Sequence, residues 1–395
     1  MKKKKSAALI VLSFIAFISL GLPDGLLGVA WPGIHGEFGL PLDALGLLLI
    51  FSTAGYTLSS FFSGPLVRRL GIGGLLTLSC GATSAALFVY AVTPFWWLFV
   101  GAAALGGLGA GAIDAGINSY VESNHSERMM QWLHASFGIG ITMGPVIMTL
   151  GIRMTSRWQS GYFIVSLAQA ALAIIFLMTK GLWKSVDSIP AGKEPVKKEA
   201  SLGETFKNSK TILSMVMFFL YVGFEVGLGL WSYSLLTISR GVDTTLAGFV
   251  TGSYWAMFTF GRVCAGWYTH KLTVTKVLYI SFILAFAGVF LLFLNTGNWV
   301  SVLGIALIGF SIAPVFPSLI SDTANRVGVR HTANTIGMQI SAAGFGAALV
   351  PSLAGVLARI YGLEVIPLYM MVTLALLFGL FILSRPRRRR EPSIK

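Results

Sequence analysis

The sequence predicts an all-α polytopic membrane protein in which twelve transmembrane helices form two pseudo-symmetric six-helix bundles. Three observations support this fold class. Of the 395 residues, 55% are hydrophobic and only 11% are charged, whereas a soluble chain of this length needs more charge to cover its surface. Apolar segments of about 20 residues, long enough to cross a bilayer of about 30 Å, recur along the whole chain. The two halves of the chain also repeat short motifs at corresponding places.

The predicted spans are joined by short connections, except between the sixth and the seventh. There, residues 183–210 form a long polar segment, which we expect to be a linker between an N-terminal bundle (1–182) and a C-terminal bundle (211–384), with a basic tail at 385–395. The first span could be a cleaved signal peptide, but it lacks a clear small-x-small cleavage site, so we expect an uncleaved helix. The twelve spans are 6–33, 41–66, 73–93, 95–121, 129–152, 158–181, 211–238, 244–268, 274–295, 299–323, 333–358 and 363–384.

Lys and Arg predict the orientation, because cytoplasmic loops carry an excess of basic residues. With these spans, 24 of the 29 basic residues fall on the side of the N-terminus, the linker and the tail. Four fall on the opposite side, and Arg262 lies within a span. We therefore expect a protein of the cell (inner) membrane with both termini in the cytoplasm. The net charge of +14 then needs no nucleic-acid partner.

Three motif pairs relate the two halves. The segment Asp24–Gly28 (DGLLG) corresponds to Glu225–Gly229 (EVGLG), since each has an acid followed four residues later by glycine. The pair Gly140 and Pro145 has the same spacing as Gly346 and Pro351, and GPLVRR after the second span corresponds to GWYTHK after the eighth. Parallel repeats of this kind close around a site near the middle of the membrane.

With these features the chain resembles the major facilitator superfamily. The segment Gly64–Gly71 (GPLVRRLG) resembles the family's signature in the loop after the second helix, with Arg68 where relatives have Asp. Within the family, YVGFEVGLGLW, GFSIAPVFPSL, WLHASFGIGITMGP and the Asp114-x-x-x-Asn118 pattern resemble the branch of fucose/proton symporters and glucose-type permeases. Ser119 stands where those relatives often have proline.

Three acids lie deep inside predicted spans: Asp24, Asp114 and Glu225. In the fold that the resemblance implies, their helices line the central cavity. A charged carboxylate at mid-bilayer costs roughly 2.5–3.5 kcal/mol on insertion scales, so each needs a partner, a proton or water. Each acid could simply tie helices together, but we interpret Asp114 as the carrier of a coupling proton, assisted by Asp24 or Glu225. The glycines Gly107, Gly109 and Gly111 are expected to pack against neighbouring helices, opposite Asp114.

Polar and aromatic side chains on the predicted cavity helices are candidates for binding the hydroxyl groups and the apolar face of a sugar. His134 could equally be a packing residue or a proton relay. Charged residues at cytoplasmic helix ends are candidates for gating contacts, and Arg262 for a partner of a helix-end acid or for binding an anion. The substrate candidates are Asn118, Tyr120, Gln131, His134, Trp231, Tyr233, Tyr254, Trp255, Asn334 and Gln339. The gating candidates are Arg68, Arg69, Glu122, Arg128, Asp322 and Arg326.

The sequence favours a secondary transporter over an enzyme. It has no Walker loop, HExxH, CxxC or nucleophile elbow, and Cys80 and Cys264 lie in separate apolar segments. We expect no cofactor, metal or disulfide, and a monomer. The favoured function is proton-coupled symport of a monosaccharide. A proton-coupled exporter of drugs or sugars, sodium coupling, and a sensor or scaffold without transport stay open.

Overall fold

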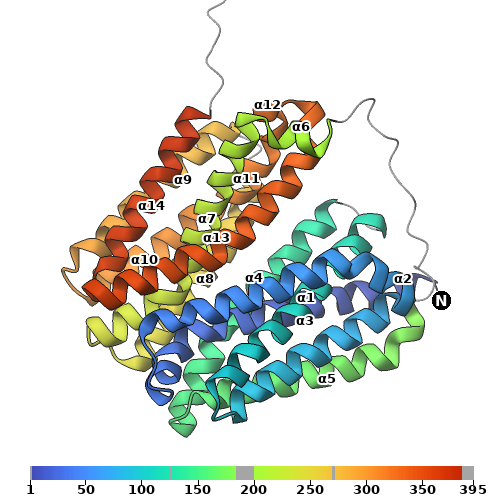
Figure 1. The fold of residues 1–395 in the computed structure, drawn as a ribbon, viewed down its shortest axis with the longest axis horizontal. Coiled ribbons are helices and arrows are strands. Elements are labelled where there is room, and N and C mark those ends of the chain that lie inside the picture. The colour runs from blue at the N-terminus through green and yellow to red at the C-terminus, as the bar shows by residue number, and fades with distance from the viewer. Residues whose placement is uncertain (1, 125–126, 184–199, 269–271, 385–395) are drawn as a thin grey trace, which may run out of the picture.

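The computed structural model describes residues 2–124, 127–183, 200–268 and 272–384, and every regular element within these ranges is helical. Figure 1 shows the arrangement. The short elements are η1 (Leu42–Ala44), α6 (Leu202–Phe206), η3 (Leu235–Ser239), α11 (Val315–Ser321), α12 (Thr323–Val327) and η4 (Val329–His331). The long helices are α1 (Lys2–Glu37), α2 (Leu45–Val92), α3 (Trp96–Asn124), α4 (Glu127–Thr155), α5 (Gln159–Trp183), α7 (Ser209–Ser234), α8 (Thr244–Tyr268), α9 (Val274–Leu294), α10 (Asn298–Ile312), α13 (Thr332–Tyr361) and α14 (Val365–Leu383).

Ten segments of the described chain are long and apolar enough to cross a membrane. One of them, Leu42–Val92, contains both the second and the third expected span, because helix α2 continues through the loop predicted between them. Gly71 breaks the regular helix with φ 69° and ψ 166°, a conformation that glycine reaches without steric cost. Helix α8 lies at the eighth expected span, and α10 with α11 fill the tenth. The predicted all-α polytopic fold is confirmed, with two crossings joined at Gly71.

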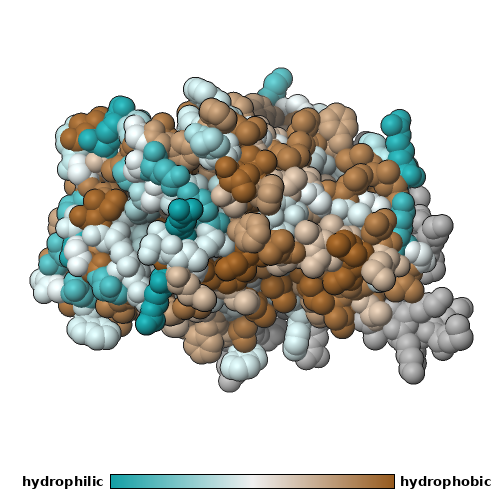
Figure 2. Space-filling view, turned by 90° about the horizontal axis from the view of Figure 1, so that it is seen from below, coloured by the Kyte–Doolittle hydropathy of each residue, from teal (hydrophilic) through white to brown (hydrophobic). Residues whose placement is uncertain are grey.

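The outer surface carries the apolar band that a membrane-spanning protein needs. Figure 2, seen from the side of helices α1–α5, shows hydrophobic residues across this face and polar residues gathered toward its ends. Large apolar side chains such as Phe61 (77% exposed), Met178 (81%) and Trp97 (71%) face outward, which a soluble protein would avoid.

The long helices form two bundles, α1–α5 in the N-terminal one and α7–α14 in the C-terminal one (Figure 1). The same glycine contact recurs in both. A Cβ atom at Gly140 would lie 2.0 Å from the carbonyl oxygen of Ile18, and a Cβ atom at Gly346 would lie 2.0 Å from that of Phe219. Helix α1 therefore touches α4 backbone to backbone, as α7 touches α13. The motif pair predicted from the sequence occupies equivalent places in the two bundles.

The bundles contact each other through α1 with α7, α2 with α13 and α4 with α8. Gly28 lies against the backbone of Gly229, so the two glycines of the repeated acid–glycine motif meet across the interface. Near the ends of α1 and α13, Arg359 pairs with Asp43 at 3.4 Å. These contacts hold the bundles together on the side away from the linker.

Toward the other end of the molecule the bundles diverge (Figure 1). We call this end the linker side, because Trp183 and Ala200, which flank residues 184–199, lie there. Gly138 of α4 packs against Thr259 of α8, and the side chain of His134, one turn closer to the linker side, is exposed. The central part of the molecule is therefore accessible from the linker side.

The last part of the expected linker is structured and docks on the C-terminal bundle. Ser201 caps α6 in a capping box with Glu204, and the Ala200 N–H donates to the carbonyl of Arg330 at 3.0 Å. The Ser201 backbone N–H and the Arg330 guanidinium hold the pKa of Glu204 below its ordinary value. The domain boundaries at 182, 210 and 384 stay predictions, since residues 184–199 and the tail at 385–395 lie outside the described residues.

Replacing Gly140 or Gly346 by Ala tests the repeated helix contact. Each Cβ would overlap a backbone carbonyl, so we expect a lower melting temperature, equivalent to about 1–3 kcal/mol of overpacking. Gly101→Ala is the control, because Gly101 is also helical and has no heavy atom within 4 Å of its Cβ position. Thermal unfolding in detergent measures the effect. A Gly140→Ala protein as stable as the Gly101→Ala protein would contradict this packing.

Candidate functional site

Two side chains hold the carboxylate of Asp114 within the N-terminal bundle. The Tyr56 hydroxyl on α2 donates to one carboxylate oxygen, and Asn118 Nδ2, one turn along α3, donates to the other at 2.9 Å. A Cβ atom at Gly111 would lie 2.2 Å from the Tyr56 carbonyl oxygen, so this glycine allows the close approach of α2. Gly111 therefore lies on the same side of α3 as Asp114, not opposite it as predicted. The close approach at Gly111 and the hydrogen bond to Asp114 are both made with α2.

Asn118 also has an atom available for a ligand. Its Oδ1 is buried and accepts no hydrogen bond from any described residue. Buried polar atoms are normally paired, so an unpaired acceptor beside a carboxylate is suited to a hydroxyl or N–H donor.

Asp24 reaches the same place from α1. Its side chain is exposed although the residue lies in the middle of a membrane-spanning helix. The Asp24 charge acts on both Asp114 and Tyr56, so Asp24 lies close to these groups. Polar side chains from α1, α2 and α3 thus share one accessible surface inside the bundle.

His134 borders this surface on α4. Its ring lies edge-on to Phe17 of α1, with ring centres 5.7 Å apart and planes at 86°. The charge of His134 acts on that of Asp114 in its own bundle and on that of Arg262 in the other bundle. His134 is therefore a residue of the N-terminal bundle whose charge acts on a residue of the C-terminal bundle.

Glu225 is the corresponding acid on α7. The Tyr221 hydroxyl lies beside its carboxylate and itself donates to the Ile312 carbonyl at 3.0 Å. The Tyr254 hydroxyl of α8 donates to the Glu225 backbone carbonyl at 2.8 Å. These two buried tyrosines fix the position of Glu225 against α8 and α10.

Arg262 lies between Glu225 and His134. Its guanidinium carbon is 4.2 Å from the centre of the Phe258 ring, and its Nε is buried without a hydrogen-bond partner among the described residues. The charges of Glu225 and His134 both act on it. Its electrostatic neighbours among the described side chains are Glu225 and His134, and the expectation that Arg262 pairs with an acid at a helix end stays a prediction.

The five ionisable side chains form a series that crosses the bundle interface, in which neighbours act on each other electrostatically. The order is Asp24, Asp114, His134, Arg262 and Glu225. Charges in a membrane interior are costly, so a change in the hydration of this region changes where protons reside. In the described part of the chain no group of three or more His, Cys, Asp or Glu residues could hold a metal ion. The chemistry this arrangement supports is binding of protons or small cations beside a polar ligand.

Several substrate candidates are buried in packing contacts elsewhere. Trp231 donates to the Pro351 carbonyl at 2.9 Å, and Tyr120 packs edge-on against Trp183. Asn334 donates to the Ala200 carbonyl at 2.8 Å, where the linker docks. We leave out of the proposed site the candidates that are buried elsewhere, together with the linker-bound Asn334: Tyr120, Trp231, Tyr233, Asn334 and Gln339.

Two further candidates support the site indirectly. Tyr254 positions Glu225, and Trp255 packs edge-on against Tyr254 with ring centres 4.8 Å apart. Trp255 also covers Gly229 at the bundle interface. The side chain of Gln131 lies outside the described residues. Of the ten substrate candidates, Asn118 and His134 are the two that the structure brings to Asp114.

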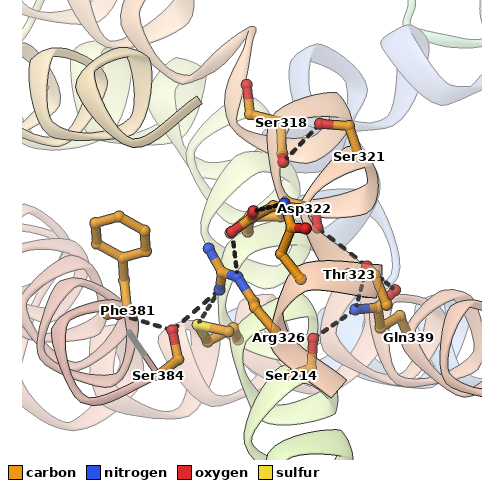
Figure 3. Close-up of polar contacts among 12 residues, drawn as sticks. Ser214, Ser318, Ser321, Asp322, Thr323, Arg326, Gln339, Phe381 and Ser384 are labelled. Atoms are coloured by element: carbon orange, nitrogen blue, oxygen red, sulfur yellow. Dashed lines mark hydrogen bonds and ion pairs between the residues drawn. The ribbon is translucent and has the colours of Figure 1, made fainter. Parts of the chain in front are cut away.

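On the linker side, Arg326 is the centre of a polar cluster inside the C-terminal bundle (Figure 3). Its Nε donates to Asp322 at 2.7 Å, a terminal nitrogen donates to Ser384 at 3.1 Å, and the guanidinium lies over the Phe381 ring at 5.3 Å. Next to it, Gln339 Nε2 donates to Ser214 and Thr323. In this conformation Asp322 and Arg326 pair with each other and not with the other bundle.

The other gating candidates lie at the same end. Arg68 and Arg69 are exposed near Gly71 of α2. The side chains of Glu122 and Arg128 lie outside the described residues. An inter-bundle contact by any of these residues stays a prediction, for a conformation in which the linker side is closed.

Sequence reasoning missed Tyr56, the hydrogen-bond donor to Asp114. Tyr56 lies in the second span, whereas the resemblance placed other helices around the cavity. The available signal was a polar ring in the apolar segment 41–66, followed by serines at 59 and 60. Nothing in the sequence related this tyrosine to an acid 58 residues away.

Two six-helix bundles that meet around a series of ionisable side chains define a class of two-bundle membrane transporter. The family model of the Major Facilitator Superfamily matches residues 9–343, and the chain belongs to this family. It is therefore a membrane transporter and not an enzyme.

Three relatives illustrate the similarity. "Bypass of stop codon protein 6" of Saccharomyces cerevisiae is 23% identical, over 93% of this chain and 80% of its own. The "Glucose/galactose transporter" of Brucella abortus is 24% identical, over 89% and 87%. "Sodium-dependent glucose transporter 1" of Homo sapiens is 22% identical, over 78% and 65%.

Solved structures share the fold at low sequence identity. A mutant of the nucleoside transporter NupG superposes with a TM-score of 0.78 at 14% identity, covering 95% of this chain and 99% of that one. A bacterial homologue of the human lysosomal transporter Spinster gives 0.77 at 15% identity, covering 97% of each chain.

Arg326→Gln tests whether the cluster of Figure 3 stabilises the C-terminal bundle. Arg326 is 5% exposed, so its loss leaves Asp322 without its cation, and breaking a buried pair typically costs about 3–5 kcal/mol. Because the Asp322 side chain is 22% exposed, we expect the lower end of that range. The measurement is thermal unfolding.

Arg330→Gln is the matched control. Its ion pair with Glu204 is 3.4 Å long and more than half exposed on both sides, so its loss should leave the melting temperature nearly unchanged. Equal melting temperatures for the two variants would show that the cluster adds nothing to stability.

Proposed function

We propose that this transporter moves a monosaccharide or a related polyol across the membrane together with protons, by alternating access. The observation that carries the proposal is the position of Asp114. Its carboxylate accepts from Tyr56 and Asn118 and faces Asp24 and His134, at a surface accessible from the linker side. Asp114 binds the coupling proton, and Asp24 and Glu225 assist.

Substrate hydroxyls suit the same surface. The free Asn118 Oδ1 accepts a hydroxyl proton, and the Asp24 carboxylate accepts others. His134 adds a ring nitrogen that donates or accepts. The names of relatives that transport glucose, galactose or mannose support a hexose as the first substrate to test.

The basic residues support an orientation for this cycle. We place the protein in the cell (inner) membrane with its linker side in the cytoplasm, because 24 of the 29 Lys and Arg residues are predicted on that side. In this orientation the described conformation is open to the cytoplasm, and we propose that the protein works as a monomeric symporter.

Asp114→Asn separates coupling from binding. The amide keeps the shape of the side chain and, like a protonated carboxyl group, has one oxygen that accepts and one group that donates, but it cannot take up or release a proton. We expect vesicles with this variant to lose accumulation of sugar above equilibrium while they keep sugar exchange. Asp243→Asn is the control, because Asp243 caps α8 outside the site and asparagine caps equally well. Accumulation by the Asp114→Asn protein under a proton gradient would refute the assignment.

Separate ion gradients test the identity of the coupling ion. Carboxylate and amide oxygens suit both a proton and a sodium ion, and a relative is named a sodium-dependent glucose transporter. We expect hexose uptake to follow an imposed pH gradient at equal sodium concentrations, as the assignment of the coupling proton to Asp114 requires. Uptake that follows a sodium gradient at constant pH would show that sodium, and not the proton, is the coupling ion.

A further inference from the structure

The contact between α4 and α8 has a regular register. A Cβ atom at Gly248 would lie 1.8 Å from Thr149 Oγ1, and one at Gly138 would lie 2.5 Å from Thr259 Oγ1. The two contacts are eleven residues apart on each helix. The helices therefore run antiparallel, and each step along α4 is matched by an equal step along α8.

Continuing this register by four residues brings His134 level with Val263, and Arg262 lies next to Val263 in the same turn of α8. His134 precedes Gly138 by four residues and Arg262 follows Thr259 by three, so each lies on the contacting face of its helix. His134 is the first exposed ionisable side chain of α4 beyond the Gly138 contact, toward the linker side. His134 and Arg262 are thus the first charged pair across the opening.

Each member of the pair is supported by a phenylalanine of its own bundle and lacks a partner across the opening. Phe17 supports the imidazole edge-on, and Phe258 lies under the guanidinium. Arg262 makes no hydrogen bond or ion pair with any other residue in the described ranges, and its Nε is buried. A guanidinium in the membrane interior without such a bond is a costly arrangement, which a further conformation can relieve.

We propose that His134 and Arg262 form the contact that closes the linker side of the transport pathway, with Arg262 donating a hydrogen bond to the neutral imidazole of His134. The inference rests on the alternating access of the proposed function. It assigns the first closing contact to these two residues, whereas the sequence pointed to charges at the helix ends.

The charged groups around the pair make closure of the linker side depend on protonation. A protonated imidazole has donors only, as does a guanidinium, so two like charges would then meet in a region of low dielectric constant. Asp114 faces His134, Asp24 faces Asp114, and Glu225 faces Arg262. An ionised Asp114 favours a protonated His134 and keeps the linker side open. A proton on Asp114 removes that attraction, so protonation of Asp114 favours closure, whereas protonation of His134 opposes it.

Distances between spin labels across the opening test the proposal. Cysteines replace Gly181 (exposed, with no heavy atom within 4 Å of its Cβ position) on the N-terminal bundle and Val329 (72% exposed) on the C-terminal bundle, in a Cys80→Ala, Cys264→Ala background. Pulsed electron paramagnetic resonance then reports short (closed) and long (open) populations. We expect the short population to decrease as the pH falls through the range in which His134 itself takes up a proton.

Three substitutions of the pair give distinct results. His134→Lys, which places a permanent cation opposite Arg262, should lose the short population at every pH. Combining it with Arg262→Glu restores opposite charges and should restore the short population. His134→Gln, which does not titrate, should remove the pH dependence. Trp132→Lys is the matched control, because it adds the same cation at an exposed position two residues away and should behave as the wild type.

The proposal fails if His134→Lys keeps a pH-dependent short population, or if the His134→Lys, Arg262→Glu protein elutes as one species and stays open. It also fails if His134→Gln titrates like the wild type. These distances need no substrate, so an absence of sugar uptake with the expected distances counts against the proposed function alone.

Discussion

A charge inside a membrane needs a partner, a proton or water, and the centre of this protein is arranged around that constraint. Three acids, one imidazole and one guanidinium lie within membrane-spanning helices, far from the loops that carry most other charges. The structure satisfies them unequally. Asp114 has two hydrogen-bond donors, whereas Arg262 has an aromatic ring beneath it and an unpaired Nε. Because Arg262 has an unpaired nitrogen in this conformation, it can gain a hydrogen-bond partner in another conformation of the transport cycle.

Glycine contacts bring these groups together. Backbone-to-backbone packing at Gly140 and Gly346 fixes α1 on α4 and α7 on α13, which places Asp24 and Glu225 at equivalent depths. Packing at Gly111 brings Tyr56 within reach of Asp114. Small residues stabilise these helix contacts, because the hydrophobic effect does not drive helices together in lipid and van der Waals packing must provide the attraction.

Hydropathy and repeated motifs predicted the fold well, and the reason is physical. A span must be apolar and about 20 residues long, so its position is written locally in the sequence. Hydropathy does not define how consecutive spans are joined, and the predicted loop between the second and third spans was wrong. There, Gly71 with a positive φ joins the two crossings into a single bent helix. The candidate site was predicted in part. Asp114, Asn118 and His134 lie together, but Asn334 binds the linker and Trp231 is buried in packing.

The sequence by itself determined that the chain spans a membrane in two similar halves and that three acids lie within its spans. Each of these follows from the composition of a short segment or from a repeat along the chain. The tertiary structure decided which side chains meet those acids. Tyr56 and Asp114 are 58 residues apart, and His134 and Arg262 belong to different bundles, so their proximity depends on helix rotation and register. Rotation and register come from many packing contacts at once, which no single stretch of sequence contains.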